Sequence, residues 1–194
     1  DCGKLGVDFP GVEMRKLIIG VMFLLMNPLA LAEVTDSSVG GFTTVNEVIV
    51  DASRAKAWVA AVNDIGSWWS PNHTISGDAA RMSIQSELQG CFCESLGEKA
   101  GVVHLVVTMV NPTNLLRMTG ALGPLGLMGV DGNMIWEFAD AEGGASVRFT
   151  YAVGGYSKDG LDKIAPAVDF VLGEALNRLK SYVETGSPEI VPVE

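Results

Sequence analysis

The chain has 194 residues, of which 48% are hydrophobic, and a formal net charge of -10 at pH 7. A chain of this length usually forms one domain with a substantial buried core. Its negative charge repels phosphate backbones and anionic membrane surfaces, so we expect no nucleic-acid partner.

The N-terminal segment has the pattern of an export leader. Arg15 and Lys16 precede the apolar run 17–26, and an Ala-x-Ala box ends at Ala32. A short basic region, a hydrophobic stretch of about ten residues and such a box are typical of a secretory signal peptide. We therefore expect 14–32 to be a signal peptide cleaved after Ala32, which leaves an exported, periplasmic or secreted protein with no stable membrane anchor. An uncleaved membrane anchor is the alternative.

Three other segments are expected to lie outside the domain. Residues 1–13 precede Met14 and are interpreted as an upstream extension that is not native. Residues 33–42 are polar and glycine-containing, which predicts a flexible lead-in. Residues 187–194 are interpreted as a C-terminal tail, so the folded domain is expected to span 43–186.

The first part of that domain predicts one strand and two short helices. Residues 43–50 are rich in β-branched side chains, which favour a strand. Asp51 and Ser53 are suitable N-caps for a short helix that follows. A second helical turn around Trp68 is expected to end at Pro71.

A meander of strands is predicted next. The segments that carry alternating or continuous apolar residues are 80–85, 90–94, 102–110, 115–119, 133–138 and 146–153. In the last two segments the aromatic residues share one face, because alternate residues of a strand point to the same side. We expect this aromatic face to contact the helix that follows.

The segment 161–185 predicts a long amphipathic helix. Its apolar residues recur at steps of three and four, and its opposite face is charged. Asp159 or Asp162 is expected to cap its start, and Gly186 to end it.

This order of elements resembles the START-like or helix-grip superfamily, also called SRPBCC, which includes polyketide cyclases and homologues of a chaperone-ATPase activator. The motifs that carry the resemblance are Val48-Ile49-Val50-Asp51-Ala52-Ser53, Ala57-Trp58, Trp68-Trp69-Ser70-Pro71 and the terminal helix. The resemblance implies an α+β fold in which a curved antiparallel sheet of about six to seven strands wraps around the C-terminal helix. It also implies an apolar or amphipathic ligand, such as a lipid or polyketide, between sheet and helix.

Aromatic, methionine and aliphatic side chains are the candidate walls and lid of such a pocket. The alternative for each is an ordinary place in the core. The candidates are Trp68, Trp69, His73, Met118, Leu125, Met128, Met134, Trp136, Phe149, Tyr151, Val168 and Leu172.

The loop 120–132 combines five glycines with large apolar residues. It lacks the Gly-Lys-Ser/Thr of a phosphate-binding loop and lies between two strands. Two interpretations are open: an apolar flap over the pocket mouth, or a loop packed on the sheet edge.

The histidines and cysteines carry weaker signals. His73 is expected at the pocket rim, where it orients a ligand or acts as a general base, or is simply solvated. His104 is expected on the outer sheet face with Thr108, if Leu105, Val107 and Met109 point inward. Cys91 and Cys93 lie two apart on a strand, a spacing that poorly fits a disulfide between them and favours two small buried residues. In an oxidising compartment, a strained or an intermolecular bridge is the alternative.

Neither a metal nor a cofactor is expected, since the two histidines and the cysteines lack metal-ligand spacing. Glu94, Arg117, Asp131 and Tyr151 are the polar groups that could reach the cavity, but they form no recognisable catalytic constellation. The sequence thus favours a small-molecule-binding protein. A cyclase or dehydratase acting on such a ligand is the first alternative, and a protein-interaction module is the second.

Overall fold

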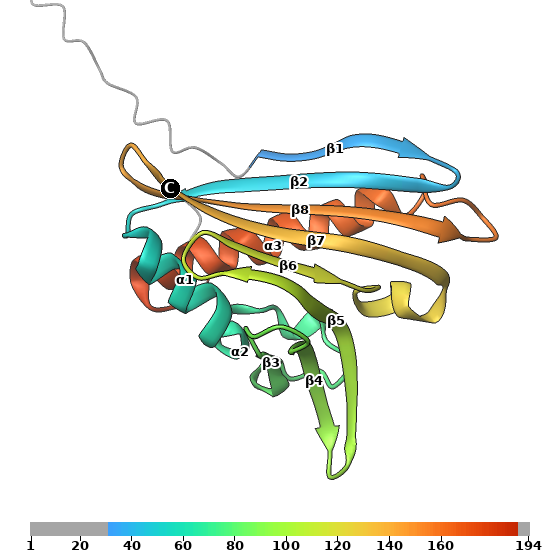
Figure 1. Ribbon diagram of the computed structural model, residues 1–194, viewed down its shortest axis with the longest axis horizontal. Coiled ribbons are helices and arrows are strands. Elements are labelled where there is room, and N and C mark those ends of the chain that lie inside the picture. Colours follow the sequence, from blue (N-terminus) through green and yellow to red (C-terminus); the bar gives the residue numbers. More distant parts are fainter. Residues whose placement is uncertain (1–30, 190–194) are drawn as a thin grey trace, which may run out of the picture.

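The computed structural model describes residues 31–189, which form an α+β fold. Eight antiparallel strands make one curved sheet in the order β1-β2-β8-β7-β6-β5-β4-β3, and the long helix α3 lies against its inner face (Figure 1). This is the architecture that the sequence predicts, with one strand more than expected.

The bounds of the elements are as follows. The strands are β1 (Leu31–Ser38), β2 (Gly41–Val50), β3 (Met82–Ile84), β4 (Cys91–Gly97), β5 (Ala100–Asn111), β6 (Leu115–Thr119), β7 (Gly129–Ala141) and β8 (Gly144–Tyr156). The α-helices are α1 (Arg54–Asn63), α2 (Ile65–Trp68) and α3 (Ala165–Thr185), and the 3-10 helices are η1 (Pro71–His73), η2 (Ala79–Arg81) and η3 (Gly123–Leu127).

The additional strand is β1. Residues 33–38, expected as part of a flexible lead-in, instead pair with β2 from Glu33 opposite Val45 to Ser38 opposite Gly41. β1 is an edge strand, and its side chains from 33 to 38 are exposed except that of Val34, which packs partly against the core. An edge strand of this kind has little hydrophobic pattern, which explains why its composition resembles that of a linker.

The leader lies mostly outside the described residues. The expectations for 1–13 and for 14–30 therefore have no structural counterpart, and the expected cut after Ala32 falls within β1. Among residues 31–189, no helix has the length and apolar character needed to cross a membrane.

The helix α3 runs along β2 and β1 and covers the edge half of the sheet. Leu172, Leu176 and Leu179 are buried against the sheet, and Lys180 Nζ donates to the Ile49 carbonyl at 2.5 Å. The helix starts at Ala165, later than the predicted 161, and no side chain caps it. Residues 161–164 form a turn whose Leu161 N–H donates to the Val39 carbonyl at 3.0 Å.

That turn means neither Asp159 nor Asp162 acts as the predicted N-cap. The predicted end is confirmed, because Gly186 adopts a left-handed conformation with φ of 81°.

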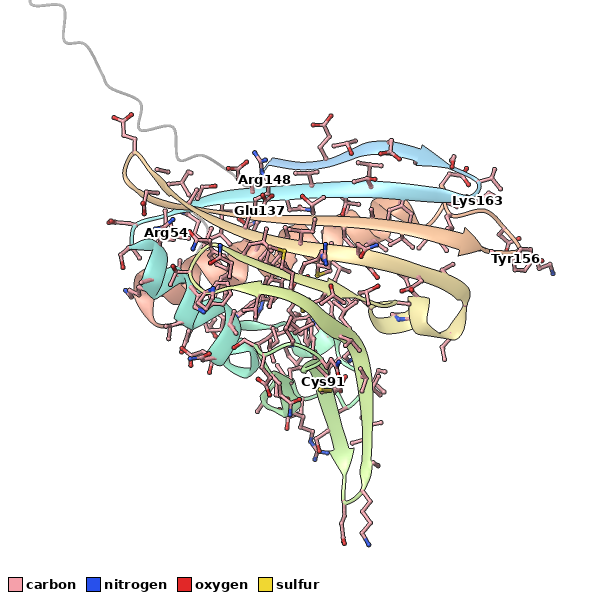
Figure 2. The ribbon with its side chains drawn as sticks, viewed as in Figure 1. Arg54, Cys91, Glu137, Arg148, Tyr156 and Lys163 are labelled. Carbon is pink, nitrogen blue, oxygen red and sulfur yellow. A yellow bond between two sulfur atoms is a disulfide. The ribbon has the colours of Figure 1, made fainter. Side chains whose placement is uncertain are left out.

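The favoured interpretation of Cys91 and Cys93 as two small buried residues is wrong, and the structure shows the alternative, because the two residues form a disulfide. The pairing of β4 with β5 shifts register between Phe92 and Cys93, and the two cysteine Cα atoms lie 5.3 Å apart. A regular strand would place them about 6.5 Å apart, near the upper limit for a disulfide. Both cysteines are half-buried on the outer sheet face, and Figure 2 marks Cys91 in β4.

Candidate functional site

The interior between the sheet and the helices is lined by aromatic side chains from several elements. Trp136 and Phe149 stack with ring centroids 4.3 Å apart, and Trp69 meets Phe92 edge-on at 5.5 Å. Trp68 packs against Trp69, and its indole Nε1 donates to the Ala60 carbonyl at 2.9 Å. These contacts join the α1–α2 segment to the centre of the sheet.

Most of the predicted wall residues meet in this interior. The candidates with at most 3% of their surface exposed are Trp68, Trp69, Met118, Leu125, Met134, Trp136, Phe149, Tyr151 and Leu172. Val168 packs partly against the same core. Met128 lies at the loop surface and His73 is half-buried, so these two are not part of the enclosed interior.

Among the described residues, three buried side-chain atoms without a hydrogen-bond partner lie on the inner face of the sheet. They are Thr44 Oγ1 and Asn46 Oδ1 on β2 and the indole Nε1 of Trp136 on β7, while a fourth, Asp162 Oδ1, lies in the turn before α3. Asn46 and Trp136 lie in one row across the sheet, because Asn46 is opposite Phe149 and Phe149 is opposite Trp136. Thr44 and Asn46 were not predicted as site residues, although their even spacing with the buried Phe42 and Val48 places them inward.

Asp169 of α3 faces this row from the helix side. The amide Nδ2 of Asn46 donates to Asp169 Oδ1 at 3.1 Å. Burial raises the pKa of Asp169, and the carboxylate of Glu33 on β1 adds to that rise, while the bond from Asn46 opposes it. The pair leaves the Asn46 carbonyl oxygen free.

The loop between β6 and β7, residues 120–128, packs on the interior through Leu125; we call this loop the flap. Leu125 anchors it with 3% of its surface exposed, whereas Leu127 is 92% exposed. The hydroxyl of Tyr151 donates to the Gly120 carbonyl at 2.9 Å and accepts from the Leu122 N–H at 3.0 Å. Burial raises the pKa of Tyr151 to about 12, so this hydroxyl stays protonated.

A buried pair, Glu94 and His104, contacts the flap through a hydrogen bond from Gly123 to His104. The predicted outward position of His104 is wrong. Phe92 is opposite Leu105 and Cys93 is opposite Val103, so His104 is the extra residue of a β-bulge and turns inward. A second register shift between Val107 and Met109 leaves Met109 exposed, although it was expected to point inward.

Glu94 and His104 connect the flap to a second loop. Glu94 accepts from His104 Nε2 at 3.1 Å, from the Ile75 N–H at 3.0 Å and from the Ser76 N–H. Burial raises the pKa of Glu94, but these hydrogen bonds outweigh it and hold that pKa below its ordinary value. The Gly123 N–H donates to His104 Nδ1 at 3.4 Å, so we assign the histidine proton to Nε2.

The remaining polar candidates lie elsewhere. His73 Nε2 is 2.9 Å from Glu174 Oε2 of α3, which fastens η1 to the helix. Arg117 bonds to Thr108 and is exposed, as is Asp131, so neither reaches the interior. Within residues 31–189, no three metal-ligating side chains gather.

Two surface hollows of the described residues lie outside the sheet–helix interior. One, of about 470 Å³, lies on the outer face of the sheet over β2, β7 and β8. The other, of about 420 Å³, lies between α1 and the end of α3.

Solved structures of other proteins share this architecture. A protein from Rhizobium leguminosarum aligns with a TM-score of 0.54 at 17% identity, over 80% of this chain and 98% of that one. The fold is a helix-grip fold. The Aha1 dimer from Colwellia psychrerythraea aligns with a TM-score of 0.51 at 17% identity, over 74% of this chain and 97% of that one.

DynU16, from the dynemicin biosynthetic locus, aligns with a TM-score of 0.52 at 16% identity, over 75% of this chain and 48% of that one. No family model matches the chain, and no match is found among curated proteins. At these identities the likeness shows the helix-grip fold alone.

Proposed function

We propose that the protein binds a small apolar or amphipathic molecule between the inner face of the sheet and α3. The observation that carries this proposal is the group of three unpaired buried atoms on the inner sheet face, Thr44 Oγ1, Asn46 Oδ1 and Trp136 Nε1. A buried polar atom without a partner costs free energy, and folded proteins leave few of them. A ligand with matching polar groups would satisfy these atoms.

The same atoms define the chemistry of the ligand. Asn46 Oδ1 requires a hydrogen-bond donor on the ligand, and Trp136 Nε1 requires an acceptor. The Thr44 hydroxyl can pair with either a donor or an acceptor. The stacked rings of Trp136 and Phe149 favour a flat apolar body between these polar ends. Asp169 disfavours a negative charge near Asn46. We therefore expect an uncharged planar molecule with hydroxyl and carbonyl groups, as in aromatic polyketides.

The flap is the route by which such a molecule enters. The interior is filled by side chains in this structure, so a ligand must displace something. The flap is held by Leu125 and by hydrogen bonds to Tyr151 and His104, and its tip residue Leu127 contacts solvent. Opening it breaks few contacts, which is typical of loops that admit ligands.

We favour binding over catalysis because the titratable side chains near the interior are already engaged in hydrogen bonds. A cyclase or dehydratase would need a group that removes a proton near the ligand. Tyr151 has its pKa raised to about 12 and its hydroxyl engaged with the flap, while His104 is engaged on both ring nitrogens. The likeness to DynU16 supports a small-molecule role without choosing between carrier and enzyme.

A titration monitored by tryptophan fluorescence tests the binding site. Planar aromatic and polyene compounds added to the full chain should quench emission with saturation at about one molecule per chain. Thr44→Val, which removes only the unpaired hydroxyl, should weaken binding about tenfold. Thr43→Val, on the outer face of the same strand, is the matched control and should bind as the wild type does. Equal binding by both variants, or no quenching by any compound, would contradict the proposal.

We also propose that this binding takes place after export. The leader pattern of residues 14–32 supports this location. Cells that make the full chain should release a form whose N-terminus, measured by mass spectrometry, is Glu33. Recovery of the intact chain from the cytoplasm alone would contradict export.

A further inference from the structure

The disulfide joins Cys91 to Cys93, which are two residues apart, so it contributes little to the stability of the fold. It closes a ring over Phe92 alone, and a disulfide restricts the unfolded chain less as the closed loop becomes shorter. Both cysteines belong to one strand, so the bond joins no separate elements. Its position therefore suggests a role other than stability.

The outer side of the disulfide is accessible and has apolar neighbours. Both cysteines are half-buried rather than enclosed. Val103, directly opposite Cys93 on β5, is 60% exposed, and Leu88 in the turn before β4 is 65% exposed. Figure 2 shows Cys91 in β4, in the half of the sheet farthest from β1. A protein that reaches the sulfur atoms would meet the exposed side chain of Val103 there.

The inner side of the same strand carries the support of the flap. Glu94 follows Cys93 directly and holds His104, whose Nδ1 accepts from the flap residue Gly123. His104 faces inward only because β5 bulges opposite Phe92 and Cys93. The disulfide thus spans the point on β4 that faces the bulge, and it holds the Cα atoms of the two cysteines at 5.3 Å.

We propose that the Cys91–Cys93 disulfide is a thiol–disulfide exchange site whose substrate is a protein dithiol, and that its reduction releases the flap. A thiolate of the dithiol attacks one cysteine sulfur, forms a mixed disulfide and displaces the other cysteine as a thiolate. The second thiol of the donor then attacks the mixed disulfide. The donor leaves oxidised, and both cysteines end as thiols after taking up two electrons and two protons.

Reduction reaches the flap through the strand. Without the bond, β4 can lengthen by about 1 Å at Phe92 toward regular strand geometry. The bulge at His104 of β5 is then no longer fixed by the disulfide on the opposite strand. The Glu94–His104 pair therefore shifts relative to Gly123. This coupling between the disulfide and the flap does not depend on the proposed ligand, because it involves only contacts within the protein.

Hydrogen exchange on the full chain tests the coupling. The protein is equilibrated in oxidised or reduced dithiothreitol, and maleimide tagging with peptide mapping separates Cys91 and Cys93 from Cys2. Reduction under native conditions should be reversible. It should speed amide exchange in residues 120–128 about tenfold, the effect of losing a hydrogen bond, with α3 unchanged. Cysteines that stay oxidised in millimolar dithiothreitol, or reduction without faster exchange in the flap, would overturn the proposal.

Two sets of variants sharpen the test. The double variant Cys91→Ser with Cys93→Ser should show the exchange pattern of the reduced protein in both buffers, and the oxidised pattern would count against the proposal. If this variant does not fold, the wild-type comparison still decides. Val103→Thr should slow reduction by a C-x-x-C protein several-fold but leave reduction by dithiothreitol unchanged. Equal slowing of both reactions, or of neither, would exclude docking of a protein at this surface.

Discussion

A hydroxyl group on the inner face of β2, that of Thr44, is fully buried and has no partner. Thr44→Val keeps the shape and removes this unpaired group, so it should stabilise the ligand-free protein by about 1–2 kcal/mol. Urea denaturation measures the change. Thr43→Val on the outer face should shift stability by less than about 0.5 kcal/mol. A Thr44→Val protein less stable than the wild type would mean that the hydroxyl has a partner in solution.

Glu94 is a residue whose charge supports two loops. Glu94→Gln should lower stability at pH 7 by about 2–3 kcal/mol, because an amide accepts less strongly from Ile75, Ser76 and His104 and places donors against donors. Glu98→Gln, at the exposed tip of the β4–β5 hairpin, is the control.

The pH dependence of the same residue has a defined sign. The folded state lowers the pKa of Glu94 from 4.5, so its contribution to stability is present above pH 4.5 and is lost as the pH falls through the lowered value. Glu94→Gln should lose less stability than the wild type between pH 4.5 and the acid limit of the fold. Parallel stability curves for the two proteins would contradict this assignment.

The residues of the site differ in how far the sequence could predict them. The aromatic residues Trp136, Phe149 and Tyr151 were predictable, because alternation within a strand assigns each a face. His104 was not, because its inward position comes from a bulge that depends on the pairing of β5 with β4. The disulfide was not predictable either, because the Cα atoms of Cys91 and Cys93 lie 5.3 Å apart rather than at the spacing of a regular strand.

At the scale of the element, the opening of the flap depends on one hydroxyl group, that of Tyr151. Tyr151→Phe removes the hydroxyl that bonds to Gly120 and Leu122, so amide exchange at Leu122 should rise about tenfold. Ligand association should speed up as well. Tyr156→Phe is the matched control, since Figure 2 shows this exposed residue at the end of β8. Equal exchange in the two variants would mean that Tyr151 does not hold the flap.

Helices and strands with a regular apolar pattern were predicted well. Elements whose position depends on pairing or contact with another segment were not. The apolar stripe of α3 and the alternation of β7 and β8 follow from local sequence. The edge strand β1 is polar and exists because β2 offers an unpaired side. The N-terminus of α3 is fixed by contact of Leu161 with Val39 rather than by a capping side chain.

At the scale of the whole molecule, β1 protects one edge of the sheet. A chain that starts at Glu33 keeps most of β1, and it should match the full chain in stability. A chain that starts at Val39 lacks β1, which exposes the backbone groups of β2, so it should be less stable and should self-associate. Denaturation and size-exclusion chromatography compare the two. A monomeric and equally stable short form would show that β1 is dispensable.

The central claim is that this helix-grip molecule holds a small apolar or amphipathic compound inside. Native mass spectrometry of the gently purified full chain, followed by organic extraction, tests it most directly. We expect a co-purifying uncharged planar molecule at about one per chain, or uptake of such a compound by empty protein. A protein that carries nothing and takes up no apolar compound would contradict the claim and would direct the search to protein partners.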